Sequence, residues 1–314
     1  MPDESKRSDV PAGQDPDRAR TDPSALPPRG PSTLAPGLYF VATPIGHSGD
    51  ITLRALDILQ KADAIAAEDT RQTRKLMQIH GIPLGARPIV SYHDQNGAQR
   101  RPQILRWLAE GRAVAYCSDA GTPLLADPGY RLAAAAIADG HPVVAAPGAS
   151  ALLAGLSVAG LPTDRFFFAG FLPPKSAARL KALAELAQIP GTLVFYESPR
   201  RLGDALADMA ACLGPRQAAV ARELTKAHEE VRRGTLDHLA DTYATAPPRG
   251  EIVIIVAPPD GGARVAEAEA ALDTELAAAL TRLTVKDAAR EVAARLGLPK
   301  RQVYARALEL SEEP

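Results

Sequence analysis

The chain has 314 residues, of which 46% are hydrophobic and only 4% are aromatic, and its formal net charge is −1. This length suits two domains and a short appendage. The balanced charge excludes an electrostatic preference of the whole chain for nucleic acid or an anionic membrane, so any basic surface must be local. Cys117 and Cys212 lie far apart, which excludes a paired metal or redox motif and favours a reducing, cytoplasmic setting. No stretch reaches ~18 uninterrupted apolar residues, so we expect a soluble, unexported protein.

Residues 1–36 are rich in proline and charged residues and contain no aromatic residue. Such a composition cannot bury enough apolar surface to offset the entropy lost on ordering. We therefore expect this segment to be a disordered tail.

Residues 37–152 are expected to form an α/β domain, because short apolar runs alternate with helical patterns. The first strand, LYFVAT, is apolar almost throughout, as in a parallel sheet that is covered on both faces. This pattern predicts a mainly parallel sheet. The further strands expected are 64–67, 88–92, 113–116 and 142–146, and the helices expected are 51–60, 71–80, 98–110, 130–139 and one that opens at 151.

Residues 163–257 are expected to form a second α/β domain with mixed or antiparallel pairing. The segment 258–266, PPDGGARVA, is expected to be a linker. The remainder, 267–314, resembles a helix-turn-helix and has a local excess of basic residues, so it is either a nucleic-acid contact or a packing hairpin with a solvated face. The elements expected in the second domain are a basic helical stretch at 175–187, strands at 192–197, 218–223 and 251–257, and a helix at 202–212.

Two loops rich in small residues follow predicted strands of the first domain. They read VATPIGHSGDIT, from Val41 to Thr52, and CSDAGTPLLADPGYR, from Cys117 to Arg131. In open α/β sheets the carboxyl ends of strands form the ligand-binding crevice. Both loops lack the lysine ending of a P-loop and the dinucleotide-binding glycine fingerprint, which favours a nucleoside-sized ligand over a triphosphate or dinucleotide. The alternative is that their glycines only permit turns with positive φ.

Five motifs of the chain resemble those of the ribosomal small-subunit methyltransferase I family, in the same order. They are VATPIG followed by DITLRAL, AAEDTR, SDAGTPLLADPGYRL, FYESPRRL and ARELTK. The resemblance covers residues 37–257 and extends to the C-terminal helical pair, although His47-Ser48 replaces a usual Asn-Leu. It implies a two-domain tetrapyrrole-methylase fold, S-adenosylmethionine in the interdomain cleft, and methyl transfer to the ribose 2′-oxygen of a cytidine in the decoding region of 16S rRNA. It also implies a homodimer.

The resemblance also implies which residues hold S-adenosylmethionine. They come from the two loops, from the segment after PGA, and from strand ends of the second domain. The expected cofactor-binding residues are Pro44, Ile45, Gly121, Thr122, Leu125, Asp127, Ser150, Ala151, Phe195, Tyr196 and Ala221.

Methyl transfer from a sulfonium needs alignment above all, but a ribose hydroxyl is a poor nucleophile unless a base or a nearby cation assists it. Glu68 and Asp69 end a short predicted strand, and Lys226 lies at a comparable strand end of the second domain. We expect these three residues to be catalytic. The alternatives are a helix N-cap for Asp69, a salt bridge from Glu68 to a nearby arginine, and an ordinary ion pair between Lys226 and Glu223.

Arg71, Arg200 and Arg201 are the expected RNA-binding residues, because guanidinium groups match phosphate oxygens. A solvated basic helix start is the alternative for the last two. Two other functions remain open: a tetrapyrrole C-methyltransferase, which would not need the basic residues, and a ribosome assembly factor without catalytic activity.

Overall fold

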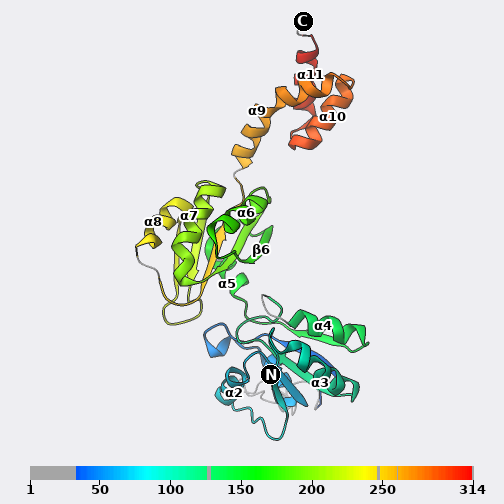
Figure 1. The fold of residues 1–314 in the computed structure, drawn as a ribbon, viewed down its shortest axis with the longest axis vertical. Helices are drawn as coiled ribbons and strands as arrows, with labels where there is room; N and C mark the ends of the chain where they lie inside the picture. The colour runs from blue at the N-terminus through cyan, green and yellow to red at the C-terminus, as the bar shows by residue number, and fades with distance from the viewer. Residues whose placement is uncertain (1–32, 126–128, 246–247, 260, 313–314) are drawn as a thin grey trace, which may run out of the picture.

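The computed structural model describes residues 33–125, 129–245, 248–259 and 261–312, with the side chains of 261–270 left out. Most of the predicted tail, 1–32, therefore lies outside the described residues. Two sheets, each with its own helices, follow one another along the chain, and three further helices follow the second sheet (Figure 1).

The first sheet is wholly parallel, with the strand order β3-β2-β4-β1-β5. Val41, the last residue of β1, pairs with both Cys117 of β4 and Ala146 of β5, so these three strands end at one edge. This edge is where ligands bind in open α/β sheets. The strands are β1 Gly37–Val41, β2 Ala64–Ala67, β3 Ile89–Ser91, β4 Ala113–Cys117 and β5 Val143–Ala146.

Helices cover both faces of this sheet, as the apolar strands require. Leu38 of β1 packs in the cluster that contains Trp107, whereas Val41 packs on the other face with Leu59 and Met77. The side chain of Asp69 caps α2, which confirms the N-cap alternative for this residue. The first-domain helices are α1 Leu53–Lys61, α2 Thr70–Ile79, α3 Gly97–Ala109 and α4 Gly129–Ala138, with a short 3₁₀ turn at Ser48–Asp50.

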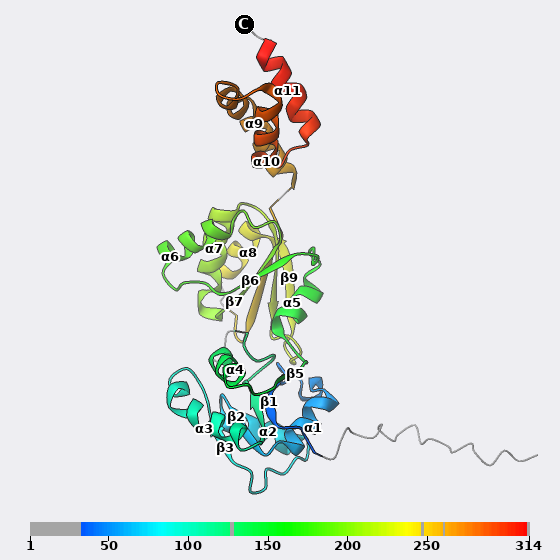
Figure 2. The same ribbon diagram turned by 90° about the vertical axis from the view of Figure 1, so that its right-hand side faces the viewer.

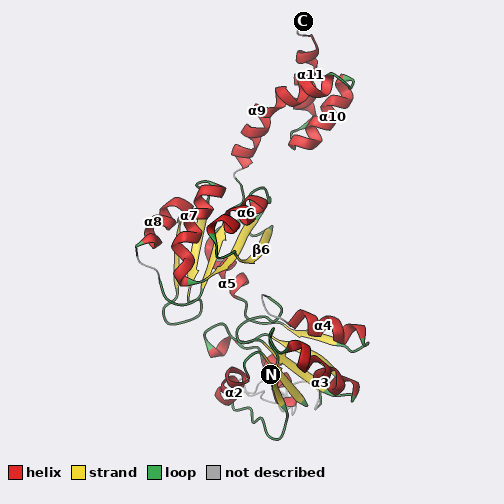
Figure 3. Ribbon diagram, in the orientation of Figure 1, coloured by secondary structure: helices red, strands yellow, loops and turns green. Residues whose placement is uncertain are grey.

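The second sheet is mixed, as expected, with the strand order β6-β7-β10-β8-β9. Figure 3 shows its strands in yellow beside the helices α6, α7 and α8. Only β6 and β7 run parallel to each other; β10 is antiparallel to both of its neighbours, and β9 is antiparallel to β8. The two edge strands were not expected, since β9 is polar and β6 is interrupted by a bulge near Gly170. The strands are β6 Phe166–Phe171, β7 Thr192–Glu197, β8 Gln217–Arg222, β9 Glu230–Thr235 and β10 Ile252–Val256.

Helix α5, Ala151–Ala159, leaves the first sheet but packs on the second (Figure 2). Leu152 and Leu156 lie in one cluster with Val194 and Val253. The structure thus assigns α5 to the second domain, although the predicted boundary at residue 152 divides it. The opposite face is covered by α6 Ser176–Leu186, α7 Leu202–Leu213 and α8 Leu236–Ala244, of which α8 was not expected.

The C-terminal unit consists of three packed helices, one more than the expected pair. Its core includes Leu276, Val292 and Val303, one from each helix. Because the first of these helices begins at Gly261, the linker predicted at 258–266 is shorter than expected. No described helix is both long and apolar enough to cross a bilayer. The helices are α9 Gly261–Leu280, α10 Val285–Leu296 and α11 Lys300–Glu312.

Gly155 allows α5 to approach the second sheet closely, because a Cβ atom there would lie 3.0 Å from the Val253 side chain. We expect Gly155→Val to lower the free energy of unfolding by about 1–3 kcal/mol through overpacking. Chemical denaturation measures this change. The control is Ser157→Val on the exposed face of the same helix, which should change stability by only about 0.5 kcal/mol; equal effects would contradict the packing argument.

Candidate functional site

Three loops are joined at the carboxyl edge of the first sheet. Thr43 and Gly121 exchange two backbone hydrogen bonds, each 3.0 Å long, between the loops that follow β1 and β4. The Thr122 hydroxyl donates to the Ala149 carbonyl at 2.9 Å and so joins the loop that follows β5. These bonds hold the two loops singled out in the sequence against each other.

Gly121 meets two requirements that other residues cannot meet together. Its φ of +81° lies in the left-handed region, and a Cβ atom would lie 3.2 Å from the Ile45 side chain. The glycine therefore does more than permit a turn: it leaves space between the two loops.

The second sheet contributes an edge of its own. The carboxyl ends of β7 and β8 meet the amino end of β10 there, because β10 is antiparallel to both. The turn after β8 holds Glu223 at φ +50° and Thr225 at φ +64°. Non-glycine residues in this region are strained, and such strain is concentrated at functional sites.

The two domains touch at the loop after β1. The His47 N–H donates to the Thr225 hydroxyl oxygen at 3.1 Å. A Cβ atom on Gly46 would lie 2.7 Å from that oxygen and 3.1 Å from the Leu224 carbonyl oxygen, so only glycine fits without displacement. This contact, which we call the interdomain clasp (Gly46, His47, Leu224, Thr225 and Lys226), sets the spacing between the two edges.

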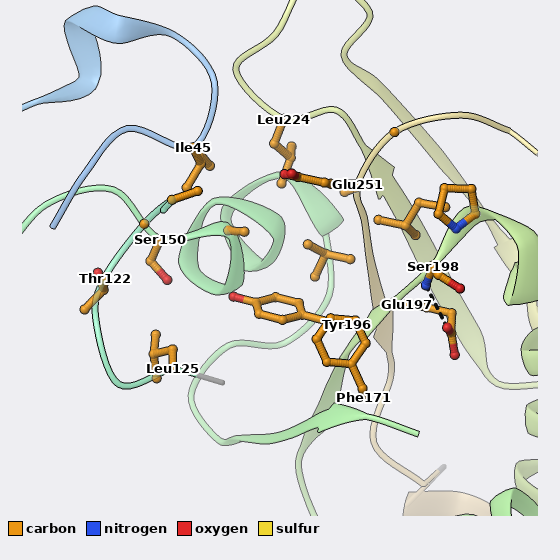
Figure 4. A pocket seen from close by; sticks show the side chains of 18 residues that line it. Ile45, Thr122, Leu125, Ser150, Phe171, Tyr196, Glu197, Ser198, Leu224 and Glu251 are labelled. Atoms are coloured by element: carbon orange, nitrogen blue, oxygen red, sulfur yellow. Dashed lines mark hydrogen bonds between the residues drawn. The ribbon is translucent and has the colours of Figure 1, made fainter. Parts of the chain in front are cut away.

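Between these edges lies a cleft of about 390 Å³, which is within the usual size range of small-molecule sites (Figure 4). Ser150 and Thr122 stand on its first-domain side and Tyr196 on its second-domain side. The lining residues are Ile45, Ala120, Gly121, Thr122, Leu125, Ser150, Ala151, Phe171, Tyr196, Glu197, Ser198, Pro199, Ala221, Leu224, Gly250, Glu251, Ile252 and Val253.

The cleft combines apolar walls with a few polar groups. The Ser150 hydroxyl is buried and has no hydrogen-bond partner among the described residues. Tyr196 is held in place because its phenol oxygen accepts from the Leu152 N–H at 3.2 Å. Burial raises the pKa of Tyr196, so the phenol keeps its proton. A flat ligand with polar edges suits this arrangement.

Eight of the eleven expected cofactor-binding residues line the cleft. Pro44 does not; it lines a separate hollow on the other side of its loop. Phe195 is fully buried in the core beneath α7, because alternate residues of a strand face opposite sides of the sheet. Asp127 lies outside the described residues. The structure therefore places Pro44 and Phe195 outside the lining of this cleft.

The expected catalytic carboxylates, Glu68 and Asp69, do not line that separate hollow, but both contact Asp119, which lines it together with Thr43. Asp119 joins them: its carboxylate accepts from the Asp69 N–H at 2.8 Å, and its own N–H donates to Glu68 at 3.2 Å. Hydrogen bonds from Arg71 hold the pKa of Asp69 at about 2. Partial burial raises the pKa of Asp119. Asp119 therefore binds a proton more readily than Asp69 does.

Lys226 lies apart from this cluster, across the loop that contains Gly46. Its ammonium contacts Glu223 at 2.8 Å and Glu251 at 3.3 Å. Burial lowers the pKa of Lys226, but the two carboxylates outweigh this and leave it raised. Lys226 therefore stays protonated and serves as a cation, never as a base. The ion-pair alternative for Lys226 and Glu223 is confirmed.

The three expected RNA-binding arginines have different surroundings. Arg201 donates through Nη2 to Glu197 at 3.0 Å and to the Leu172 carbonyl at 2.6 Å, so it joins β7 to the end of β6. Arg200 is exposed. Arg71 is also exposed, although its guanidinium pairs with Asp69 at 2.7 Å.

Sequence reasoning missed several lining residues. Three of them lie at the start of β10, namely Glu251, Ile252 and Val253. The start of a strand lies at the ligand edge only where that strand runs antiparallel to its neighbours, as β10 does. Phe171 belongs to a strand that was not expected. Asp119 lies in a loop that the sequence analysis singled out. Its position two residues after the end of β4 could have identified it as a candidate site residue.

Neighbouring positions on β7 test the division between core and cleft. We expect Phe195→Leu to lower the free energy of unfolding, on the order of 1–2 kcal/mol, and to leave ligand affinity unchanged. Tyr196→Leu should weaken binding of S-adenosylmethionine, the ligand that the resemblance implies, by about tenfold, because the aromatic wall is lost. Calorimetry measures the affinity, and chemical denaturation measures the free energy of unfolding. A loss of affinity in Phe195→Leu alone would overturn this division.

Comparison with known proteins agrees with this architecture. The profile of Tetrapyrrole (Corrin/Porphyrin) Methylases matches residues 37–240, and the RsmI C-terminal HTH domain matches residues 266–311. Among solved structures, a cobalt precorrin-4 methyltransferase is similar with a TM-score of 0.55 and 18% identity, covering 70% of this chain and 94% of its own. A diphthine synthase is similar with a TM-score of 0.55 and 15% identity over 70% of this chain and 89% of its own. These structures support the fold.

Curated relatives are much more similar in sequence. A ribosomal RNA small subunit methyltransferase I from Mesorhizobium japonicum is 48% identical and covers 89% of this chain and 94% of that protein. The protein of the same name from Halalkalibacterium halodurans is 42% identical, covering 85% of this chain and 93% of its own length. The chain belongs to the ribosomal RNA small subunit methyltransferase I family and has the tetrapyrrole methylase fold.

Proposed function

We propose that the chain transfers a methyl group from S-adenosylmethionine to the ribose 2′-oxygen of a cytidine in the decoding region of 16S rRNA, the one usually numbered 1402. Extensive identity to curated methyltransferases of that name supports the reaction. The observation that carries the proposal is the cleft between the two sheets, with apolar walls and a buried hydroxyl that lacks a partner. We expect this activity in the cytoplasm, because the proposed substrate is a ribosomal subunit.

The residues of the cleft suit S-adenosylmethionine. Ile45, Leu125 and Leu224 provide apolar surface for the adenine, and the Ser150 hydroxyl is free to bond a polar group of the nucleoside. A uroporphyrin-III C-methyltransferase from Thermus thermophilus with S-adenosyl homocysteine bound has a similar fold, with a TM-score of 0.50. The cofactor supplies an electrophilic methyl group when it is bound. The chain supplies alignment, since clefts of fixed width hold reactants in a productive orientation.

We place the acceptor ribose at the hollow beside the cleft. The Thr43–Gly121 contact separates the two spaces, so a ribose at the hollow would approach the cleft across this contact. Asp119, whose pKa is raised, is better suited to take a proton than Asp69, whose oxygens are engaged by Arg71 and the start of α2. We assign Glu68 to holding the Asp119 backbone and Lys226 to holding Glu223 and Glu251 beside the clasp.

A methylation assay tests the proposed function. Small ribosomal subunits from a strain that lacks the gene are incubated with the purified chain and S-adenosylmethionine, and ribose methyl groups are mapped by mass spectrometry. We expect one new methyl group in the decoding region. Methylation of a tetrapyrrole but not of RNA, or failure to bind S-adenosylmethionine, would contradict the proposal.

Asp119→Asn tests the base. We expect kcat to fall by about 10²–10⁴, since general bases contribute that much. In the unchanged chain kcat should rise with pH as Asp119 loses its proton, and its raised pKa should displace this rise above the ordinary range for aspartate. The variant should lack that rise.

The control for this experiment is Asp69→Asn, because asparagine also caps helices and keeps α2 in place. We expect its kcat to stay within about threefold of the original, far from the effect of a lost base. The opposite order of effects would assign the base to Asp69.

We further propose that the chain forms a homodimer through β6. This edge strand exposes Phe166, Phe167 and Phe171, which are 45%, 42% and 58% accessible. Unpaired apolar edges are rare on monomers because they promote association. Phe171 also lines the cleft, so a second copy would cover one side of it.

Sedimentation equilibrium tests the dimer. We expect a dimer for the original chain and a monomer for Phe166→Lys with Phe167→Lys, because two buried charges without partners oppose association. The control is Leu153→Lys on the exposed face of α5, and this variant should remain dimeric. A monomeric original chain would overturn this part of the proposal.

A further inference from the structure

The basic residues of the C-terminal unit fall into two groups. In the first group, arginines are neutralised by carboxylates of the same unit. Arg282 pairs with Glu291, Arg295 with Glu275, and Arg306 with both Asp273 and Glu309. These pairs join α9, α10 and α11 and account for part of the excess of basic residues noted in the sequence.

The second group lines one groove between α10 and α11, which we call the basic groove (Lys286, Ala289, Arg290, Lys300, Arg301 and Tyr304). No carboxylate lines it among the described residues. Its four cationic side chains are exposed, and among the described residues only Arg290 of these four makes an ion pair, with Asp287 at 2.8 Å. Positive charge without local compensation is therefore concentrated here.

The start of α11 is electrostatically unfavourable without a ligand. Lys300 and Arg301 occupy its first turn, which contains no acidic residue. Helix N-termini carry partial positive charge and favour anions, so cations placed there repel the helix dipole. The backbone N–H groups at a helix N-terminus also bind phosphate well. An anion in the basic groove would remove this repulsion.

Tyr304 gives the groove a second property. It lies one turn after Lys300 on α11 and is 42% exposed, although large aromatic side chains are scarce in this chain. An exposed ring beside several cations is the arrangement with which proteins stack an unpaired nucleobase while the cations contact its phosphates. The ring favours single-stranded RNA or a loop over a purely ionic ligand.

We propose that the basic groove binds the phosphate backbone of single-stranded or looped RNA, with a base stacked on Tyr304. The inference rests on the proposed function and adds an RNA-binding surface to it. None of the groove residues lines the cleft between the sheets or the hollow that contains Asp119. Figure 1 shows the C-terminal unit at the end of the second domain away from the first. The groove thus holds RNA outside the region where the methyl group is transferred.

The test uses the full chain and a fluorescent RNA hairpin with the decoding-region sequence, in about 0.1 M salt. The double variant Lys300→Gln with Arg301→Gln should bind on the order of tenfold more weakly. The slope of log affinity against log salt should fall by about 1.4, since each phosphate contact in a single strand contributes about 0.7. S-adenosylmethionine binding and the melting temperature should not change.

The matched control is Arg282→Gln with Arg295→Gln, which removes the same charge from the same C-terminal unit but outside the groove. We expect RNA affinity to stay within about threefold, because these cations are already neutralised. Equal weakening in both double variants would show a non-specific effect of net charge and would overturn the inference.

Variants of Tyr304 distinguish the contribution of base stacking from the contribution of charge. Tyr304→Leu should weaken RNA binding by about tenfold without changing the salt slope, whereas Tyr304→Phe should retain affinity. Equal affinity of Tyr304→Leu and the original chain would overturn the stacking role. Competition by duplex DNA as strong as that by the unlabelled hairpin would overturn the preference for unpaired RNA.

Failures of the two proposals are distinguishable. If the original chain methylates small subunits but the Lys300 and Arg301 variant binds RNA unchanged, only the groove assignment fails. If the original chain neither binds nor methylates RNA, the proposed function itself fails.

Discussion

The reciprocal hydrogen bonds between Thr43 and Gly121 are the constraint on which the site depends. They hold the loops after β1 and β4 together, and Gly121 lines the cleft whereas Thr43 lines the neighbouring hollow. The left-handed backbone at Gly121 is needed for this contact, and Ile45 packs against it. One short contact between loops therefore lies between the two spaces that the proposed reaction uses.

The interdomain clasp sets the second dimension of the site, the distance between the sheets. Gly46 fits against Leu224 and Thr225 only because it has no side chain, and the strained turn from Glu223 to Lys226 receives it. Strain at such a turn persists where surrounding contacts enforce it. The strained turn lowers the stability of the folded chain at the place where the two domains meet beside the cleft.

Much of the fold was predictable because local patterns and tertiary packing agree. Buried parallel strands need continuous apolar runs, and Asp69 and Thr284 are at helix starts where their side chains cap. The edge strand β9 was missed because EVRRGT lacks the apolar pattern of a buried strand. The linker before the C-terminal unit was predicted too long because its glycines begin a helix.

The sequence by itself determined the alternation of strands and helices, the two ligand loops and, through its motifs, the family. Only the tertiary structure decided which side chains reach the cleft. Tyr196 faces it and Phe195 does not, because neighbouring strand residues face opposite sides and the sequence does not say which side is covered by three helices. Glu251 belongs to the site because β10 runs antiparallel to β7, a pairing that joins residues distant in sequence.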